Sequence, residues 1–228
     1  MSTTQRLVIV TLIGALVGSL AAFWYVRRAP APAPRAESGV GQTTPGATAT
    51  DGTAAAQRAK EVPNDLPDFT LATLEGPPKA LSSFKQPVLV VNFWATWCAP
   101  CRREIPLLRQ IRAERGPKGL EIVGIAVDFR EEVQKYVTKI GLDYPLLIGE
   151  EDGLAAADKF GVDAVFPFTA FADAQRRIVA LKVGELHAEE ASFILDRVEK
   201  LNAGGLSIEA ARQQIRDELT RLAAVRGK

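Results

Sequence analysis

The chain has only two cysteines, and two residues separate them in the pentapeptide WCAPC, which begins at Trp97. Residues 88–95, directly before it, form a near-continuous apolar run of the kind found in strands that are covered on both faces. A helix is expected from about Cys98 to about residue 116. The cysteine pair therefore stands where a buried strand passes into a helix, and this arrangement favours an α/β fold.

The spacing of the cysteines favours redox chemistry over a structural crosslink. A disulfide across two intervening residues closes a very small loop, for which loop entropy contributes only about 2 kcal/mol. The positive end of the helix dipole is expected to favour the thiolate of Cys98. Cys101, one turn further on, can attack a mixed disulfide formed at Cys98. We therefore expect a redox-active disulfide Cys98–Cys101, with Cys98, at the exposed helix start, as the attacking thiol and Cys101 as the resolving thiol.

The rest of the chain to about residue 201 alternates between strand and helix patterns. Strands are expected at residues 69–73, 80–84, 120–127, 144–148, 168–172 and 177–183, and further helices at 154–160 and 188–201. A capping box of Asp128 and Glu131 is expected to open another helix that ends at Gly141. This order predicts a mixed sheet with helices on both faces, in a domain spanning residues 62–205.

A last helix is expected within residues 206–228, beginning after Ser207 as its N-cap and ending near Val225. It carries a stripe of apolar residues along one side. Such a stripe either packs on the domain or contacts a partner chain, and both interpretations stay open at this point.

The N-terminal 61 residues are expected to form a membrane anchor followed by a tether. Residues 7–26 contain no charged side chain, and a helix of this length spans about 30 Å, the thickness of a bilayer core. Residues 1–28 are therefore expected to be an uncleaved transmembrane anchor. The alternative, a signal peptide cleaved near Ala21, fits less well because the apolar core of a signal peptide is usually only about 7–15 residues long. Residues 29–61, rich in Pro, Ala, Thr and Gly, are expected to form a flexible tether.

Composition excludes several classes of function. The 28 Lys and Arg residues nearly balance the 27 Asp and Glu residues, giving a net charge of +1, which argues against a protein that binds nucleic acid. The single histidine, His187, excludes a His-based metal cage. We expect no metal site and no cofactor.

Three stretches, at residues 67–71, 80–84 and 90–106, resemble the TlpA/ResA-like thioredoxin-fold proteins. The resemblance implies a bacterial inner-membrane protein with a single span and a catalytic domain in the periplasm. Its implied role is to reduce disulfides in extracytoplasmic clients such as apocytochrome c or copper-site proteins of oxidase assembly. A membrane thiol protein would supply the electrons. The arginines after the anchor favour the opposite orientation by the positive-inside rule, and here the resemblance decides.

The resemblance also implies a client-binding site. Phe166-Pro167 matches the family's cis-proline position, and the loop there would face Cys98 and pair with an extended client strand. Trp97, together with Trp94, is expected to pack around the cysteines and to shape this surface. An ordinary trans proline at a strand edge is the alternative.

Glu104 is the candidate general base. Thioredoxins carry a buried Asp on the strand before the cysteines, but the corresponding residue is Asn92, whose amide cannot accept a proton. Glu104 lies one turn after Cys101 on the same helix face, where the family often has an acid. The alternative interpretation is a solvated first-turn carboxylate stabilised by the helix dipole.

Other functions of the same residues are open. The fold could work as a thiol oxidant or isomerase, because the sequence does not determine a redox potential. The cysteine pair could also bind Cu(I) in a copper chaperone. A peroxidase is disfavoured, since peroxiredoxins have a Thr three residues before the reactive Cys, where this chain has Ala95.

Overall fold

The computed structural model describes residues 61–163 and 165–227. The expected anchor at residues 1–28 and nearly all of the expected tether at 29–61 lie outside these residues. Within the described part of the chain, no helix combines the length and the apolar character needed to cross a membrane.

A mixed seven-stranded sheet forms the centre of the domain, in the order β2-β1-β5-β4-β3-β6-β7. β3, β4 and β5 are parallel to one another, and the remaining pairs are antiparallel. The strands are β1 (Thr70–Thr73), β2 (Lys79–Ala80), β3 (Val88–Trp94), β4 (Leu120–Ala126), β5 (Leu146–Ile148), β6 (Phe168–Ala172) and β7 (Ile178–Val183). Every residue of β3 is buried, which agrees with its near-continuous apolar sequence.

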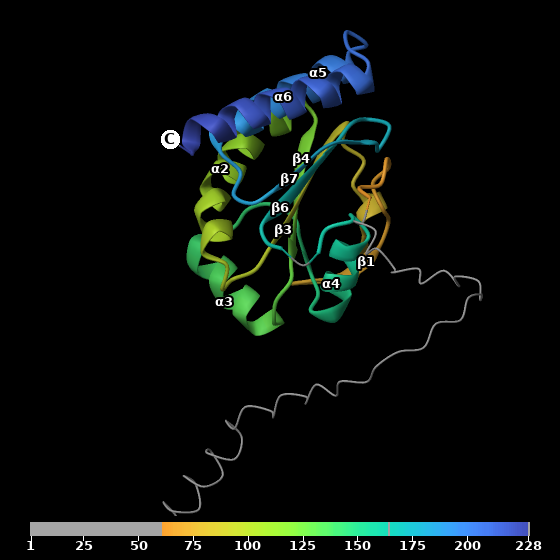
Figure 1. The fold of residues 1–228 in the computed structure, drawn as a ribbon. Coiled ribbons are helices and arrows are strands. Elements are labelled where there is room, and N and C mark those ends of the chain that lie inside the picture. Colours follow the sequence, from red (N-terminus) through yellow and green to blue (C-terminus); the bar gives the residue numbers. More distant parts are fainter. Residues whose placement is uncertain (1–60, 164, 228) are drawn as a thin grey trace, which may run out of the picture. The chain divides into compact units, whose positions relative to one another are not determined.

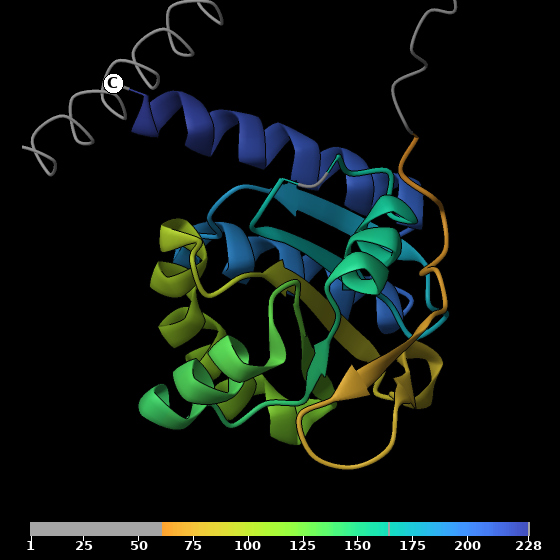
Figure 2. The same cartoon turned by 90° about the horizontal axis from the view of Figure 1, so that it is seen from below.

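Helices cover both faces of this sheet (Figures 1 and 2). They are α2 (Ala99–Arg115), α3 (Arg130–Ile140), α4 (Glu151–Asp158), α5 (Ala188–Asn202) and α6 (Ile208–Arg226). On one face, apolar residues of the strands pack against α2, α3, α5 and α6, and on the other they pack against α4. The predicted mixed sheet with helices on both faces is confirmed.

Two local predictions are wrong. Residues 81–84, expected to continue a strand, instead form a 3-10 helix over Leu81–Ser83 and its C-cap. The capping box at the start of α3 is absent, because the N-cap is Phe129 and no side chain caps that end. The Asp128 carboxylate instead accepts hydrogen bonds from Thr96, on the loop that leads to the cysteines. A tertiary contact has therefore replaced the local one that the sequence spacing suggested.

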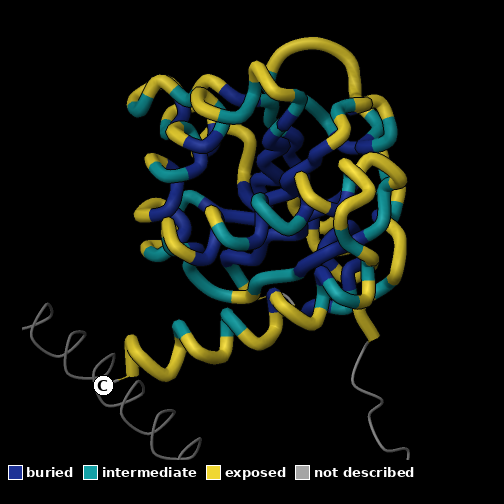
Figure 3. Tube along the Cα trace, turned by 90° about the horizontal axis from the view of Figure 1, so that it is seen from above, coloured by how far each residue is buried: buried dark blue, intermediate teal, exposed yellow. Residues whose placement is uncertain are grey.

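α6 packs against α5 and β7 through a narrow stripe in which Ala211 and Ile215 are buried. The Ser207 side chain caps its start by accepting a hydrogen bond from the Ala210 amide. Most of its remaining surface is exposed (Figure 3). Packing on the domain, one of the two interpretations of the apolar stripe, is therefore observed.

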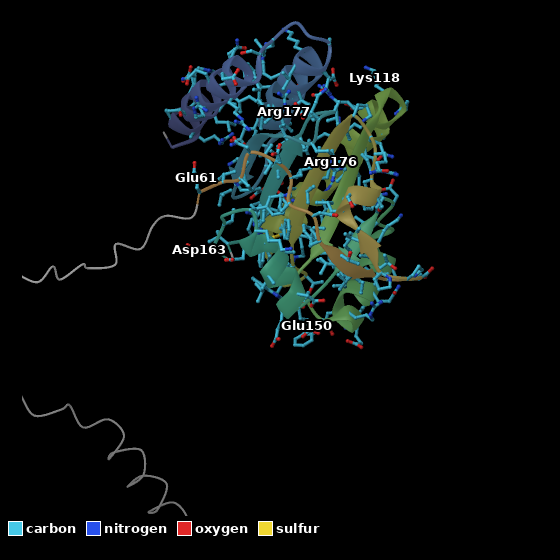
Figure 4. All side chains as sticks on the ribbon, turned by 90° about the vertical axis from the view of Figure 1, so that its right-hand side faces the viewer. Glu61, Lys118, Glu150, Asp163, Arg176 and Arg177 are labelled. Atoms are coloured by element: carbon cyan, nitrogen blue, oxygen red, sulfur yellow. A yellow bond between two sulfur atoms is a disulfide. The ribbon has the colours of Figure 1, made fainter. Side chains whose placement is uncertain are left out.

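The turn between β6 and β7 binds the N-terminal segment of the domain. Figure 4 shows Arg176 and Arg177 near this segment, which begins at Glu61. The Arg176 carbonyl accepts a hydrogen bond of 2.8 Å from the Leu66 amide, and the backbones of Asp65 and Arg177 form an antiparallel bridge. The segment thereby covers the outer edge of β7 near its start.

Gly124, in the middle of β4, is expected to tolerate no side chain. A Cβ there would lie 2.8 Å from Leu146 Cδ1, 3.0 Å from Tyr144 Cε2 and 3.2 Å from Trp94 Nε1. Because the rings of Tyr144 and Trp94 are buried and have little room to move, we expect Gly124→Ala to lower the free energy of unfolding by about 1–3 kcal/mol in a denaturant titration. Gly116→Ala is the control, since its Cβ would lie 3.9 Å from the nearest neighbouring atom, Arg112 Cγ, and its φ is −56°. An equal loss in both variants would show that packing around Gly124 is not the cause.

Candidate active site

The two cysteines form a disulfide at the start of α2, with an S–S distance of 1.95 Å and Cα atoms 5.3 Å apart. Cys98 is the N-cap of α2, and its Sγ accepts a hydrogen bond of 3.3 Å from the Cys101 amide. Both this amide and the dipole of α2 favour the thiolate form of Cys98. The expectation that Cys98 is exposed is wrong, because it is 4% exposed; Cys101 is 0% exposed. Of the two cysteines, Cys98 is the one that keeps residual exposure to solvent.

Aromatic residues lie beside the disulfide. Trp97 is 67% exposed, and its ring lies 6.3 Å from that of Phe166 in an edge-to-face arrangement. The Phe166–Pro167 peptide bond is cis, the form that the family resemblance implied. Trp94, in contrast, is fully buried, so the expectation that it helps to shape the client surface is wrong.

Glu104 is buried behind the disulfide, with an exposed fraction of only 1%. Its Oε1 accepts a hydrogen bond of 2.7 Å from Asn92 Nδ2, and its Oε2 accepts one of 2.7 Å from the Leu186 amide. Asn92 Nδ2 lies also 3.0 Å from Thr169 Oγ1 on the neighbouring strand β6. The interpretation of Glu104 as a solvated first-turn carboxylate is therefore wrong.

Burial raises the pKa of Glu104 to about 7, because the charged form loses its hydration. The hydrogen bonds from Leu186 and Asn92 oppose this shift, since they stabilise the carboxylate. Among nearby charges, Glu185 raises the pKa of Glu104 and Lys182 lowers it. Glu104 can therefore exchange a proton near neutral pH.

The loop that carries Trp97 and Cys98 is held by a buried carboxylate. Asp128 Oδ2 accepts hydrogen bonds of 2.8 Å from the Thr96 amide and 2.5 Å from the Thr96 hydroxyl. Asp128 Oδ1 accepts a third, of 2.8 Å, from the Phe129 amide. These bonds tie the loop after β3 to the loop after β4 next to the cysteines.

Sequence reasoning missed Thr169, Asp128 and Leu186 as parts of this site. A signal for Thr169 existed, because it and Asn92 are polar residues within apolar strands that pair in register. No comparable signal marks Leu186, which contributes its backbone amide. Within residues 61–163 and 165–227, no three side chains of the His, Cys, Asp and Glu types are grouped so that they could hold a metal ion.

Comparison with known proteins places the chain in a family. The AhpC/TSA family model matches residues 62–203. The chain is 29% identical to the thiol-disulfide oxidoreductase ResA of Geobacillus thermodenitrificans over 141 residues, which are 61% of this chain and 79% of that protein. It is 31% identical to the thioredoxin-like protein YneN of Bacillus subtilis over 141 residues, covering 57% of this chain and 76% of YneN.

A solved structure extends the comparison to three dimensions. The secreted thiol-disulfide isomerase of Corynebacterium glutamicum superimposes with a TM-score of 0.54 at 30% identity, covering 68% of this chain and 98% of the isomerase. The chain therefore belongs to the AhpC/TSA family and is a thiol-disulfide oxidoreductase of the thioredoxin fold, similar to ResA.

Proposed function

We propose that this protein is a membrane-tethered reductant of disulfides in extracytoplasmic client proteins. The observation that carries the proposal is the buried Glu104 carboxylate, which lies one turn after Cys101 and whose pKa is raised to about 7 by burial. A reductant must deprotonate its resolving thiol each time it releases a client. A neighbouring carboxylate that titrates near neutral pH is suited to accept that proton.

The proposed reaction starts from the dithiol form. The Cys98 thiolate attacks one sulfur of the client disulfide, and the other client sulfur leaves as a thiolate. The Cys101 thiol then passes its proton to Glu104 and attacks Cys98 Sγ. This second step forms the Cys98–Cys101 disulfide and releases the second client thiolate, so the client gains two electrons and this protein loses two.

The client is proposed to bind across the exposed aromatic edge. Trp97 offers an apolar surface, and the backbone of Phe166, next to the cis bond, offers hydrogen-bonding groups to an extended strand; Pro167 has no N–H, and its carbonyl accepts from the Gly184 amide. The proximity of the Trp97 and Phe166 rings, whose centroids are 6.3 Å apart, supports a shared surface. Clients of the class of apocytochrome c or of copper-site proteins of oxidase assembly fit this proposal, and a membrane thiol protein would return the dithiol form.

The location is part of the same proposal. The uncharged run at residues 7–26 would anchor the chain in the bacterial inner membrane, and residues 29–61 would tether the domain on the periplasmic side. The match to an isomerase that is described as secreted supports this side of the membrane.

Labelling in spheroplasts tests location and redox direction together. We expect a membrane-impermeant maleimide to label Cys98 without added reductant, because Cys98 is proposed to be reduced and outside the cytoplasm. Labelling only after lysis would overturn the orientation. Labelling only after addition of a reductant would show that the resting protein is oxidised, as expected for a thiol oxidant.

Two alternatives use the same residues and are separated by purified protein. An isomerase would restore activity to a protein with scrambled disulfides, whereas a reductant leaves that protein reduced. A copper chaperone would bind Cu(I) through Cys98 and Cys101. Equilibration with glutathione buffers gives the direction, since about 30 mV corresponds to a tenfold change in the equilibrium constant.

A further inference from the structure

The C-terminal helix α6 lies beyond residues 62–203, which the family model matches, yet its last turn contacts the first turn of α5. Arg226 Nη2 forms an ion pair with Glu190 Oε1 on α5. Glu190 is only 1% exposed, which is rare for a carboxylate and requires compensating partners. α6 thus supplies a cation to a buried acid on the helix next to it.

The other partners of Glu190 lie in the turn before α5 and on β7. Its Oε2 accepts a hydrogen bond of 3.0 Å from the His187 amide, so that Glu190 and His187 form the capping box of α5. Its Oε1 lies 3.5 Å from Lys182 Nζ. Glu190 therefore holds the backbone at His187. It also competes with Glu104 for the positive charge of Lys182.

The same turn holds Glu104. The Leu186 amide donates a hydrogen bond of 2.7 Å to Glu104 Oε2, and the next amide, that of His187, donates to Glu190. Two successive N–H groups thus bind two buried carboxylates, one at the active site and one paired with α6. Because the two amides belong to adjacent residues of the loop before α5, Glu190 and Glu104 are bound by the same short stretch of backbone.

One of the charged groups near Glu104, Lys182, also lies next to Glu190. Glu104 faces Asn92 on β3, Lys182 on β7, Glu185 in the turn before α5, and Tyr144 before β5. Lys182 stabilises the Glu104 carboxylate, whereas Glu185 destabilises it. Glu185 is itself paired with Arg103 at 2.5 Å, so Lys182 is the cation that can be redistributed between two carboxylates.

We propose that α6 is a positioning element for Glu104, acting through the Arg226–Glu190 ion pair and the turn at Leu186 and His187. The role of Glu104 as a base rests on the proposed function, but its positioning by α6 does not. With Arg226 in place, the negative charge of Glu190 is balanced by Arg226, and Lys182 can stabilise the Glu104 carboxylate. Without Arg226, Glu190 draws Lys182 away and the Leu186 amide is held less firmly. Both changes favour the protonated form of Glu104.

The test is a titration of the Glu104 carboxyl by carbon-13 NMR in the full chain, comparing the wild type with Arg226→Gln. We expect the midpoint to rise by about half a pH unit in Arg226→Gln and to return in Arg226→Lys, which restores the cation. If Glu104 is the base, resolution of a mixed disulfide then slows about threefold at pH 6 and is unchanged at pH 9. A purely structural role would lower stability without moving the midpoint.

Arg221→Gln is the matched control, because Arg221 pairs with Glu218 within α6 and is 61% exposed in its side chain. It should leave the midpoint unchanged. An unchanged midpoint in Arg226→Gln would overturn the inference about α6. A shifted midpoint with an unchanged rate profile would instead overturn the proposed role of Glu104 as a base, so the two failures are distinguishable.

Discussion

Cys98→Ser is expected to abolish reduction of a protein disulfide, whereas Cys101→Ser stops the reaction at a mixed disulfide. The Cys98 sulfur lies at the N-terminus of α2, where the Cys101 amide and the helix dipole stabilise a thiolate. Without that nucleophile, the rate with a model protein disulfide should fall by about three orders of magnitude or more. In Cys101→Ser the first attack proceeds, but nothing releases the client, so one covalent adduct per protein accumulates.

Acid quenching of the reaction, followed by mass spectrometry, measures both outcomes. In the reduced wild type, Cys98 should also react faster than Cys101 with an alkylating reagent at neutral pH, because it keeps 4% exposure and Cys101 has none. Adducts that accumulate in Cys98→Ser but not in Cys101→Ser would reverse the assignment of the two thiols.

Glu104→Gln is expected to slow resolution of the mixed disulfide by about 10- to 100-fold and to leave the first attack by Cys98 nearly unchanged. Only the second step requires the Cys101 thiol to lose its proton, and the buried Glu104 is the acceptor in this proposal. In the wild type, the rate of the second step should rise with pH through about 7, as Glu104 becomes ionised. In Glu104→Gln this rise should be absent, since glutamine does not titrate.

Stopped-flow fluorescence with acid-quenched samples separates the two steps. Glu114→Gln is the control, because Glu114 lies on the same helix and its contact is an exposed hydrogen bond with Gln110. An unchanged rate of resolution in Glu104→Gln would reduce Glu104 to a buried structural carboxylate.

The raised pKa of Glu104 also makes a prediction for stability that does not depend on catalysis. The ordinary pKa of 4.5 applies in the unfolded chain, and burial raises the value to about 7 in the fold. Between these pH values the folded state binds more protons, so the free energy of unfolding falls as pH rises. This contribution is fully present below pH 4.5 and amounts to at most about 3 kcal/mol lost by pH 7 and above. Denaturant titrations of the oxidised protein should show this slope in the wild type and not in Glu104→Gln.

Much of the fold could be predicted from local patterns. The apolar run at β3 and the periodic helices were placed within a few residues, because burial on both faces and helical periodicity leave strong signals. The predicted capping box at the start of α3 is wrong because a tertiary contact replaced a local one. Asp128 has the spacing of a helix cap, but its carboxylate binds Thr96 on another loop, which no sequence separation reveals.

The site could be predicted in part for the same reason. Cys98 and Cys101 are neighbours in sequence, so their disulfide follows from spacing, and Glu104 follows from the helix period. The environment that decides the pKa of Glu104 comes from elsewhere in the chain. The Leu186 amide is 82 residues away, and Arg226 at the end of α6 reaches that turn only through Glu190.

Cys98 is proposed to exchange disulfides with client proteins outside the cytoplasm. Trapping the mixed disulfide between Cys98 and a client in cells tests this most directly. The full-length Cys101→Ser variant, expressed in place of the wild type, is alkylated in acid and purified without reductant. Peptide mapping then identifies the residue that carries each bound partner. We expect extracytoplasmic proteins linked through a cysteine to Cys98 and none in Cys98→Ser. Recovery of cytoplasmic proteins on Cys98, or of equal adducts in Cys98→Ser, would contradict it.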